Sequence, residues 1–203
     1  MVTENKNRNV WNSHYTKPEA KLKIPDENVV RYFIKYLQNK KNENLKVLDL
    51  GCGSGRHLFY LKEIGISAVG LDFSYEALLS LPFKKILSSV DCIPFADNSF
   101  DVVLSWGVLH YLSEENAKKS VIEINRILKK EGSFLLTIRS DKDTHLNNVL
   151  KKGALKDGSA LLYSKEKAEE LLSNFSDIRY GFISRIPLGE NKLIAHHIFE
   201  ARK

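Results

Sequence analysis

The stretch VLDLGCGSGRH, residues 47–57, decides the fold of this chain. A compact apolar strand carries an acid, Asp49, and runs into three glycines at alternate positions, Gly51, Gly53 and Gly55. Glycine adopts positive φ readily and lets a ligand approach the backbone, and a loop between a strand and a helix points amide N–H groups at that ligand. The stretch therefore predicts a ligand-binding turn after the first strand of an α/β domain.

The spacing of the glycines separates several kinds of nucleotide site. A dinucleotide fingerprint, GxGxxG, would place its third glycine at position 56, which is Arg56, and this disfavours a NAD-binding dehydrogenase. A P-loop would need GKS or GKT, and neither is present. The alternative that needs no ligand is a tight turn in which Asp49 acts as a capping residue.

Strand and helix patterns alternate from Leu45 onward. Apolar runs predict strands at 47–50, 67–72, 85–91, 100–106 and 133–138, and two more, near 178–186 and 192–201, that form a hairpin. Helices are predicted at 56–64, 75–81 and 164–174, and between Ser113 as N-cap and Lys129, Lys130 and Gly132 at the end. We expect a three-layer α/β/α sandwich with a Rossmann-like, seven-stranded, mostly parallel sheet that ends in an antiparallel hairpin.

Residues 1–42 precede the alternating strands and helices and have a different pattern. Residues 1–24 are a polar, partly flexible lead with two aromatic residues, Trp11 and Tyr15. Pro25 then opens an amphipathic helix, which a polar linker at 38–42 follows. We expect residues 1–42 to form this lead and helix and residues 43–203 to form the main domain. Two interpretations of the aromatic pair stay open: the lead folds over the ligand pocket as a lid, or it pins the helix to the core.

Composition limits the function further. The 203 residues fit one domain, and no apolar run reaches the length of a membrane span. The polar N-terminus lacks a secretory signal, and neither the two cysteines nor the six histidines have metal-ligand spacing. We therefore expect a cytoplasmic protein with no metal and no membrane association. A net charge of +6 is compatible with a nucleic-acid partner, but the lysines are spread along the chain, which does not favour one.

The pattern D-x-G-x-G-x-G from Asp49 to Gly55 resembles motif I of the class I S-adenosylmethionine (SAM)-dependent methyltransferases, and the type 11-like resemblance covers residues 45–140. In that family the loop wraps the methionine part of SAM, and the acid helps to hold its amino group. The resemblance implies that Asp49, Gly51, Cys52, Gly53 and Gly55 bind SAM, and that S-adenosyl-L-homocysteine is the product. SAM carries no phosphate, so a carboxylate is tolerable where a pyrophosphate would be repelled.

Two further strand ends carry ligand-binding candidates. Asp72 ends the second strand, is placed to accept hydrogen bonds from both ribose hydroxyls, and is followed by Phe73. The segment after the fourth strand, SWGVLHYL at 105–112, resembles the family's loop where the methyl donor faces the acceptor. There Trp106 could place a π face near the sulfonium, or it could simply belong to the core.

The segment SVDCIPFADNSFD, residues 89–101, is similar to the family's D…LPF…D.SFD segment. In the family an acid and its neighbour bind adenine, because a carboxylate accepts from the amino group and a backbone amide donates to the ring. The resemblance implies either that Asp91 is the acid or, in a strict alignment, that Ser89 and Val90 occupy the two adenine-binding positions.

The family's chemistry is an in-line displacement at a methyl carbon, in which the protein mainly aligns and desolvates the reactants. A general base is needed only if the acceptor enters protonated with a high pKa. His110 is the best-placed candidate by sequence, against a helix-cap or surface role. Trp11, Tyr111 and Arg139 are candidate acceptor contacts, and Arg139 would suit an acidic acceptor unless it forms a surface salt bridge.

The small size of the chain argues against an added RNA- or protein-recognition domain. We therefore expect a methyltransferase that acts on an oxygen or nitrogen atom of a small-molecule acceptor. One alternative is a tRNA methyltransferase, which steeply salt-dependent binding of tRNA would indicate. The other is a catalytically silent SAM-binding regulatory module, which would bind SAM without turnover.

Overall fold

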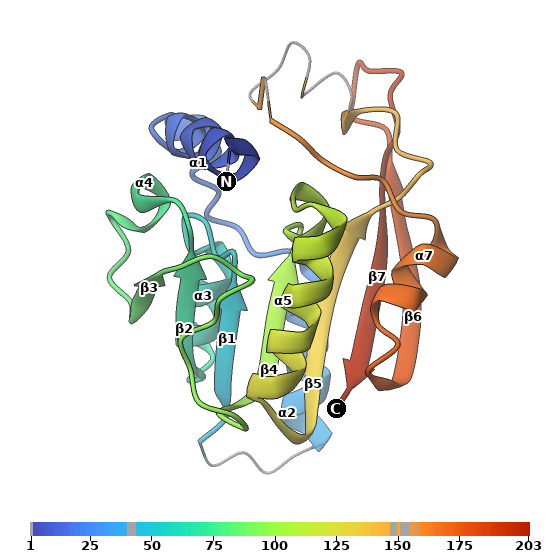
Figure 1. Ribbon diagram of the computed structural model, residues 1–203. Coiled ribbons are helices and arrows are strands. Elements are labelled where there is room, and N and C mark those ends of the chain that lie inside the picture. The colour runs from blue at the N-terminus through green and yellow to red at the C-terminus, as the bar shows by residue number, and fades with distance from the viewer. Residues whose placement is uncertain (1, 40–43, 147–149, 151–154, 157) are drawn as a thin grey trace.

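The computed structural model describes residues 2–39, 44–146, 150, 155–156 and 158–203. Its centre is a seven-stranded sheet with the order β3-β2-β1-β4-β5-β7-β6 (Figure 1). Neighbouring strands from β3 to β5 run parallel, and β7 runs antiparallel to both β5 and β6. The predicted fold class is therefore confirmed. The strands are β1 (Lys46–Leu50), β2 (Ser67–Asp72), β3 (Lys85–Leu87), β4 (Phe100–Trp106), β5 (Leu128–Arg139), β6 (Ser176–Arg185) and β7 (Ile194–Arg202).

Helices cover both faces of this sheet. On one face α2 (Glu27–Asn39) and α3 (Arg56–Glu63) share a core with the strands, and on the other face α5 (Glu114–Ile127) and α7 (Lys165–Leu171) do so. Successive side chains of a strand point to opposite faces, so Val102 and Leu104 of β4 belong to the first core and Val103 to the second. The shorter helices are η1 (Pro18–Ala20), α4 (Tyr75–Leu78) and η2 (Leu109–Tyr111).

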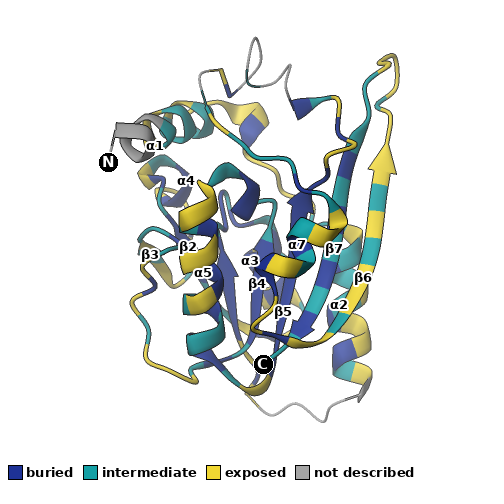
Figure 2. Ribbon diagram, turned by 45° about the vertical axis from the view of Figure 1, so that its right-hand side comes forward, coloured by how far each residue is buried: buried dark blue, intermediate teal, exposed yellow. Residues whose placement is uncertain are grey.

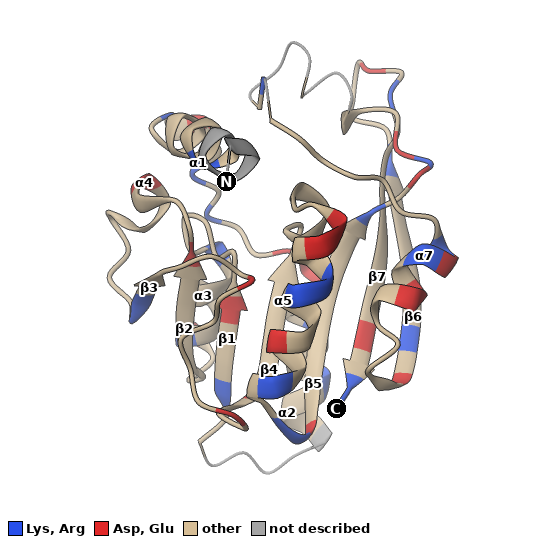
Figure 3. Ribbon diagram, in the orientation of Figure 1, with Lys and Arg blue, Asp and Glu red and all other residues tan. Residues whose placement is uncertain are grey.

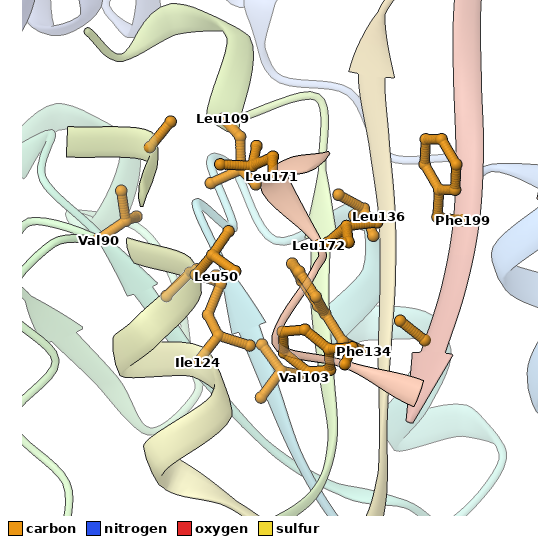
Figure 4. Packing of buried hydrophobic residues seen from close by; sticks show 14 of the residues in the cluster. Leu50, Val90, Val103, Leu109, Ile124, Phe134, Leu136, Leu171, Leu172 and Phe199 are labelled. Atoms are coloured by element: carbon orange, nitrogen blue, oxygen red, sulfur yellow. The ribbon is translucent and has the colours of Figure 1, made fainter. Parts of the chain in front are cut away.

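The core beneath α5 and α7 is the larger of the two and fixes the central strands. Figure 4 shows Ile124 of α5 and Leu172 beside Val103 and Phe134 of the sheet. Figure 2 shows that the central strands are buried, whereas β6 at the edge is largely exposed. The carboxyl ends of β1, β2 and β4 are therefore held by rigid, buried strands, and loops that follow them are positioned accurately.

The N-terminal lead begins with a helix, α1 (Val2–Tyr15), which the sequence did not predict. Its sequence lacks a broad apolar stripe, which is the usual signal for an amphipathic helix. Figure 1 shows α1 lying across the carboxyl ends of the strands instead of on a face of the sheet. There it packs on loops through a few aromatic and amide side chains, so it needs no apolar stripe.

The C-terminal end of α5 was also predicted too far along the chain. The helix ends at Ile127, and β5 begins at Leu128, which pairs with Phe100 of β4. Lys129 and Gly132 consequently belong to the strand, and Nζ of Lys129 lies 2.8 Å from Oδ2 of Asp101. The local charge pattern resembled a helix terminus, but pairing with β4 decides the structure here. The predicted helices at 75–81 and 164–174 and the strand at 85–91 are shorter than expected.

The predicted linker at 38–42, and with it the proposed boundary after residue 42, lies largely outside the described residues. Throughout the described ranges, no helix has both the length and the hydropathy needed to cross a membrane. Over the same residues, no group of three His, Cys, Asp or Glu side chains is arranged to hold a metal ion.

Candidate functional site

The glycine loop between β1 and α3 forms a tight turn at the carboxyl end of the sheet. The amides of Gly51 and Cys52 both donate to the carbonyl oxygen of Leu71, at 2.7 and 3.0 Å. Gly51 and Gly53 have φ values of 69° and 53°, in the left-handed region that favours glycine. A Cβ atom on Gly53 would collide with the phenol oxygen of Tyr15 in α1. The loop and α1 therefore fit together only because position 53 has no side chain.

We expect Gly53→Ala to lower the free energy of unfolding by about 2 kcal/mol, because left-handed strain and the collision with Tyr15 add together. Gly65→Ala is the matched control, since Gly65 has a φ of 76° and open space around it. Urea unfolding should show a loss of about 1 kcal/mol for Gly65→Ala, and the extra loss for Gly53→Ala should shrink in a Tyr15→Phe background, which removes the nearest colliding atom. Equal losses at both glycines would show that α1 does not pack on the loop.

Two buried carboxylates lie beside this loop. Asp72 accepts from the amide of Gly53 through Oδ2 and from that of Ser74 through Oδ1, both at 2.8 Å. Burial raises the pKa of Asp72 to about 6, although those amides act in the opposite direction. Asp49 is 1% exposed, and no described residue donates a hydrogen bond to its Oδ2, which lies 3.9 Å from Nδ1 of His57. Each carboxylate has unused capacity to accept hydrogen bonds.

Helix α1 spans the loop and is anchored at two points along its length. Oδ1 of Asn12 accepts from the hydroxyl of Ser74 at 2.8 Å, beside α4. Nδ2 of Asn7 donates to the carbonyl oxygen of Tyr111 and to Oγ of Ser159, both at 3.1 Å. The helix is thus tied to the end of β2 on one side and to η2 on the other, with the glycine loop between them.

The underside of α1 is aromatic. Trp11 stacks on Tyr15 with 5.8 Å between ring centroids and meets the ring of Tyr111 edge-on at 4.9 Å. Burial raises the pKa of Tyr15 well above its usual value, so its phenol stays protonated. His14 meets Trp11 edge-on, and burial and the nearby Lys17 lower the pKa of its imidazole. The imidazole is therefore neutral at pH 7.

These elements line an open cavity of about 900 Å³, toward the upper end of the range for small-molecule sites. Its floor is the glycine loop and the ends of β2 and β4, and its cover is α1. Most of the residues predicted from the sequence line it: Trp11, Tyr15, Gly51, Cys52, Gly53, Asp72, Phe73, Ser89, Val90, Trp106 and Tyr111.

The remaining predicted residues do not line the cavity: Asp49, Gly55, Asp91, His110 and Arg139. Asp49 lies directly behind the glycine loop at the end of β1. Because Ser89 and Val90 reach the cavity and Asp91 does not, the strict alignment of the adenine segment suits the geometry better.

His110 and Arg139 lie behind the cavity wall. His110 is 1% exposed, and burial and Arg139 lower its pKa well below the usual value. Its ring lies 6.2 Å from that of His196, whose pKa burial lowers to about 4. Arg139 donates to Oδ2 of Asp143 at 3.0 Å in a buried ion pair, not on the surface as one interpretation had it. Neither side chain is placed to touch a ligand in the cavity.

Several cavity residues, His14 and Arg56 among them, were missed as ligand contacts from the sequence. Arg56 was considered only as a departure from the dinucleotide pattern. His14 follows Trp11 by three positions and Asn7 by seven, so the three share one face of a helix. Recognition of α1 as a helix would have revealed that face.

Comparison with known proteins points to one family. Residues 48–136 match the family described as "Methyltransferase domain". An uncharacterized methyltransferase of Synechocystis sp. is 33% identical over 96 residues, 45% of this chain and 45% of that protein. A probable tRNA methyltransferase 9B of Homo sapiens is 27% identical over 108 residues, 51% of this chain and 23% of that protein. The chain thus spans less than half the length of these two curated relatives.

Solved structures share the fold over a longer stretch. A SAM-dependent methyltransferase of Methanosarcina mazei superposes with a TM-score of 0.67, covers 83% of this chain and 96% of its own, and is 19% identical. At that identity the likeness concerns the fold alone.

Proposed function

We propose that this chain, which matches a methyltransferase domain over residues 48–136, is a class I SAM-dependent methyltransferase and transfers the methyl group of SAM to an oxygen or nitrogen atom of a small-molecule acceptor. The cavity carries this proposal. Its volume of about 900 Å³ has room for a nucleoside-sized donor and a small second ligand, and α1 covers it. A covered cavity of this size suits a metabolite better than a macromolecular acceptor.

The donor half of the cavity fits SAM in its chemistry. The glycines leave backbone amides accessible at the start of α3, and Asp72 has free lone pairs for two ribose hydroxyls. The unpartnered Oδ2 of Asp49 lacks the hydrogen-bond donor that an ammonium group supplies. We assign Ser89 and Val90 to the adenine ring and Trp106 to the sulfonium end.

When bound, SAM supplies an activated methyl group: the acceptor's lone pair forms the new bond as the C–S pair returns to sulfur. A hydroxyl or ammonium acceptor must also lose a proton. We propose that His14, not His110, accepts it, because His14 lines the cavity and is neutral. Nδ1 of His14 is buried, which leaves Nε2 as the accessible nitrogen.

The position of His14 on α1 supports this role. Residues 12 and 14 lie about 160° apart around a helix of 3.6 residues per turn. Asn12 contacts Ser74 beside the ribose-binding acid, so His14 lies on the opposite side of the helix. We further propose that α1 acts as a lid, which excludes water during transfer and opens for exchange of donor and product.

Methylation of tRNA is the second candidate, favoured by the relative named as a tRNA methyltransferase and by the net charge of +6. Figure 3 argues against a continuous basic face on the side that it shows, because positive and negative residues alternate along α5. A basic face or stripe is the usual footprint of nucleic-acid binding.

Calorimetry followed by a transfer assay tests the proposal. We expect micromolar binding of SAM and S-adenosyl-L-homocysteine, and transfer of label from methyl-labelled SAM to members of a panel of small alcohols, phenols and amines. Label in bulk tRNA alone would favour the second candidate. Tight SAM binding without transfer would indicate a silent module, and no binding by the folded protein would contradict the donor assignment.

A further inference from the structure

Three aromatic rings line the cavity between the glycine loop and η2. Tyr15 stands over Gly53 at one end, and Tyr111 of η2 stands at the other. Trp11 lies between them, at an interplanar angle of 28° to Tyr15 and 81° to Tyr111. We call Trp11, Tyr15 and Tyr111 the aromatic wall. Because all three rings are only partly buried, the wall keeps apolar surface that a ligand can cover.

The angles within the aromatic wall suit a planar, aromatic ligand. Trp11 and Tyr111 lie nearly at right angles, so a flat ring that is parallel to one of them is perpendicular to the other. Offset stacking and edge-to-face contact are the two arrangements that aromatic pairs prefer, and both stabilise binding beyond the burial of area. A saturated ring of the same size covers a similar area but lacks the quadrupole on which these arrangements depend.

The charged residues near the aromatic wall do not select a strongly charged acceptor. Glu114 and Glu115, in the first turn of α5, line the cavity, but both form ion pairs. Nζ of Lys167 lies 3.0 Å from Oε2 of Glu114. Nζ of Lys119 lies 2.7 Å from Oε1 of Glu115. Arg8 of α1 also lines the cavity and is exposed to solvent. Exposed and paired charges contribute little, so this part of the cavity suits an uncharged ring better than an ion.

We propose that the acceptor is an aromatic compound with a hydroxyl or amino group, whose ring is held against Trp11 and Tyr111. His14 lies beside the same rings, since the centroid of its imidazole is 5.4 Å from that of Trp11 and 5.3 Å from that of Tyr15. A hydroxyl or amino group on a ring that contacts the wall is therefore near the imidazole. This inference rests on the proposed function, in which the chain methylates a small molecule.

Matched pairs of acceptors test the preference for an aromatic ring. Benzyl alcohol and cyclohexylmethanol carry the same hydroxyl beside an aromatic or a saturated ring, and benzylamine and cyclohexylmethylamine do so for an amino group. At saturating SAM, the aromatic member of a methylated pair should have a kcat/KM about tenfold higher, as two aromatic contacts should give. Trp11→Leu should abolish this preference, and Trp11→Phe should retain part of it. Phe182→Leu, which removes an exposed ring of β6 outside the cavity, should leave the preference unchanged.

Equal kcat/KM values for the two members of each pair would overturn the proposal, and so would a preference that persists in Trp11→Leu. If Trp11→Leu does not fold, as judged by circular dichroism, Tyr111→Leu replaces it, and the same loss of preference is expected. If the wild type methylates neither pair, calorimetry of its complex with S-adenosyl-L-homocysteine decides. Tighter binding of the aromatic member is then expected, and equal or undetectable binding of both members overturns the proposal. Failure of the wild type to bind SAM, or label in tRNA alone, would instead contradict the proposed function.

Discussion

Replacing Asp72 by alanine should weaken the binding of S-adenosyl-L-homocysteine by about a hundredfold, because two charged hydrogen bonds to ribose would be lost together. The carboxylate is 4% exposed, and its two amide partners hold it in place at the end of β2. Asp72→Asn keeps one oxygen acceptor, so its affinity for S-adenosyl-L-homocysteine should fall by about tenfold. Titration calorimetry of both variants measures these losses.

The neighbouring acid Asp91 distinguishes the two alignments of the adenine segment. It does not line the cavity, so Asp91→Asn should leave the affinity within about twofold of wild type, less than one hydrogen bond would contribute. If Asp91→Asn lost as much affinity as Asp72→Asn does, Asp91 would be the adenine-binding acid. Thermal unfolding of each variant shows whether the protein remains folded at the temperature of the titration.

The same carboxylate predicts a pH dependence of binding. Burial raises the pKa of Asp72 to about 6, so part of it is protonated below that pH in the free protein. Ribose hydroxyls donate to the ionised form, so binding should release a proton and affinity should fall on acidification. Between pH 8 and pH 5.5 we expect a loss of about fourfold. Asp72→Asn should show no such change, and a wild-type affinity that rises toward low pH would contradict the ribose assignment.

The parallel sheet could be predicted from the sequence because its signals are local. Continuous apolar runs such as Val102–Leu104 occur in strands that are buried on both faces, and each is followed by a turn or a helix signal. The start of β5 could not be predicted in this way. Lys129 and Lys130 have the pattern of a helix end, and only pairing with β4 and the ion pair to Asp101 make that segment a strand.

The candidate site likewise contains some residues that local sequence signals identify and others that only tertiary contacts identify. The glycine loop, Asp72, Ser89 and Trp106 stand next to strand ends, so their motifs identify them without knowledge of the tertiary structure. The cover of the cavity depends on distant contacts: Asn12 binds Ser74, 62 positions away, and Asn7 binds Ser159, 152 positions away. No local pattern predicts such pairs. For that reason the helical state of the lead and the position of His14 had to come from the structure.

Loss of the imidazole of His14 should have the largest kinetic effect. With an acceptor that must lose a proton, we expect His14→Asn to lower kcat by about a hundredfold or more, within the range for removal of a general base. The affinity for S-adenosyl-L-homocysteine should stay within about twofold, because the predicted role of His14 concerns the acceptor and not the donor. Single-turnover transfer with an acceptor from the panel measures the first quantity, and calorimetry measures the second.

The pH profile of kcat separates proton transfer from a structural role. Burial and Lys17 lower the pKa of His14, so the wild-type rate should decline on acidification only below about pH 6.5, the ordinary value. The wild-type rate should level off above that pH, whereas the residual rate of His14→Asn should rise continuously with pH as solvent hydroxide takes the proton. His145→Asn is the matched control, because His145 does not line the cavity and pairs with Glu190. A His14→Asn variant that is merely slower, with the wild-type profile intact, would show that His14 orients the acceptor and that another group takes the proton.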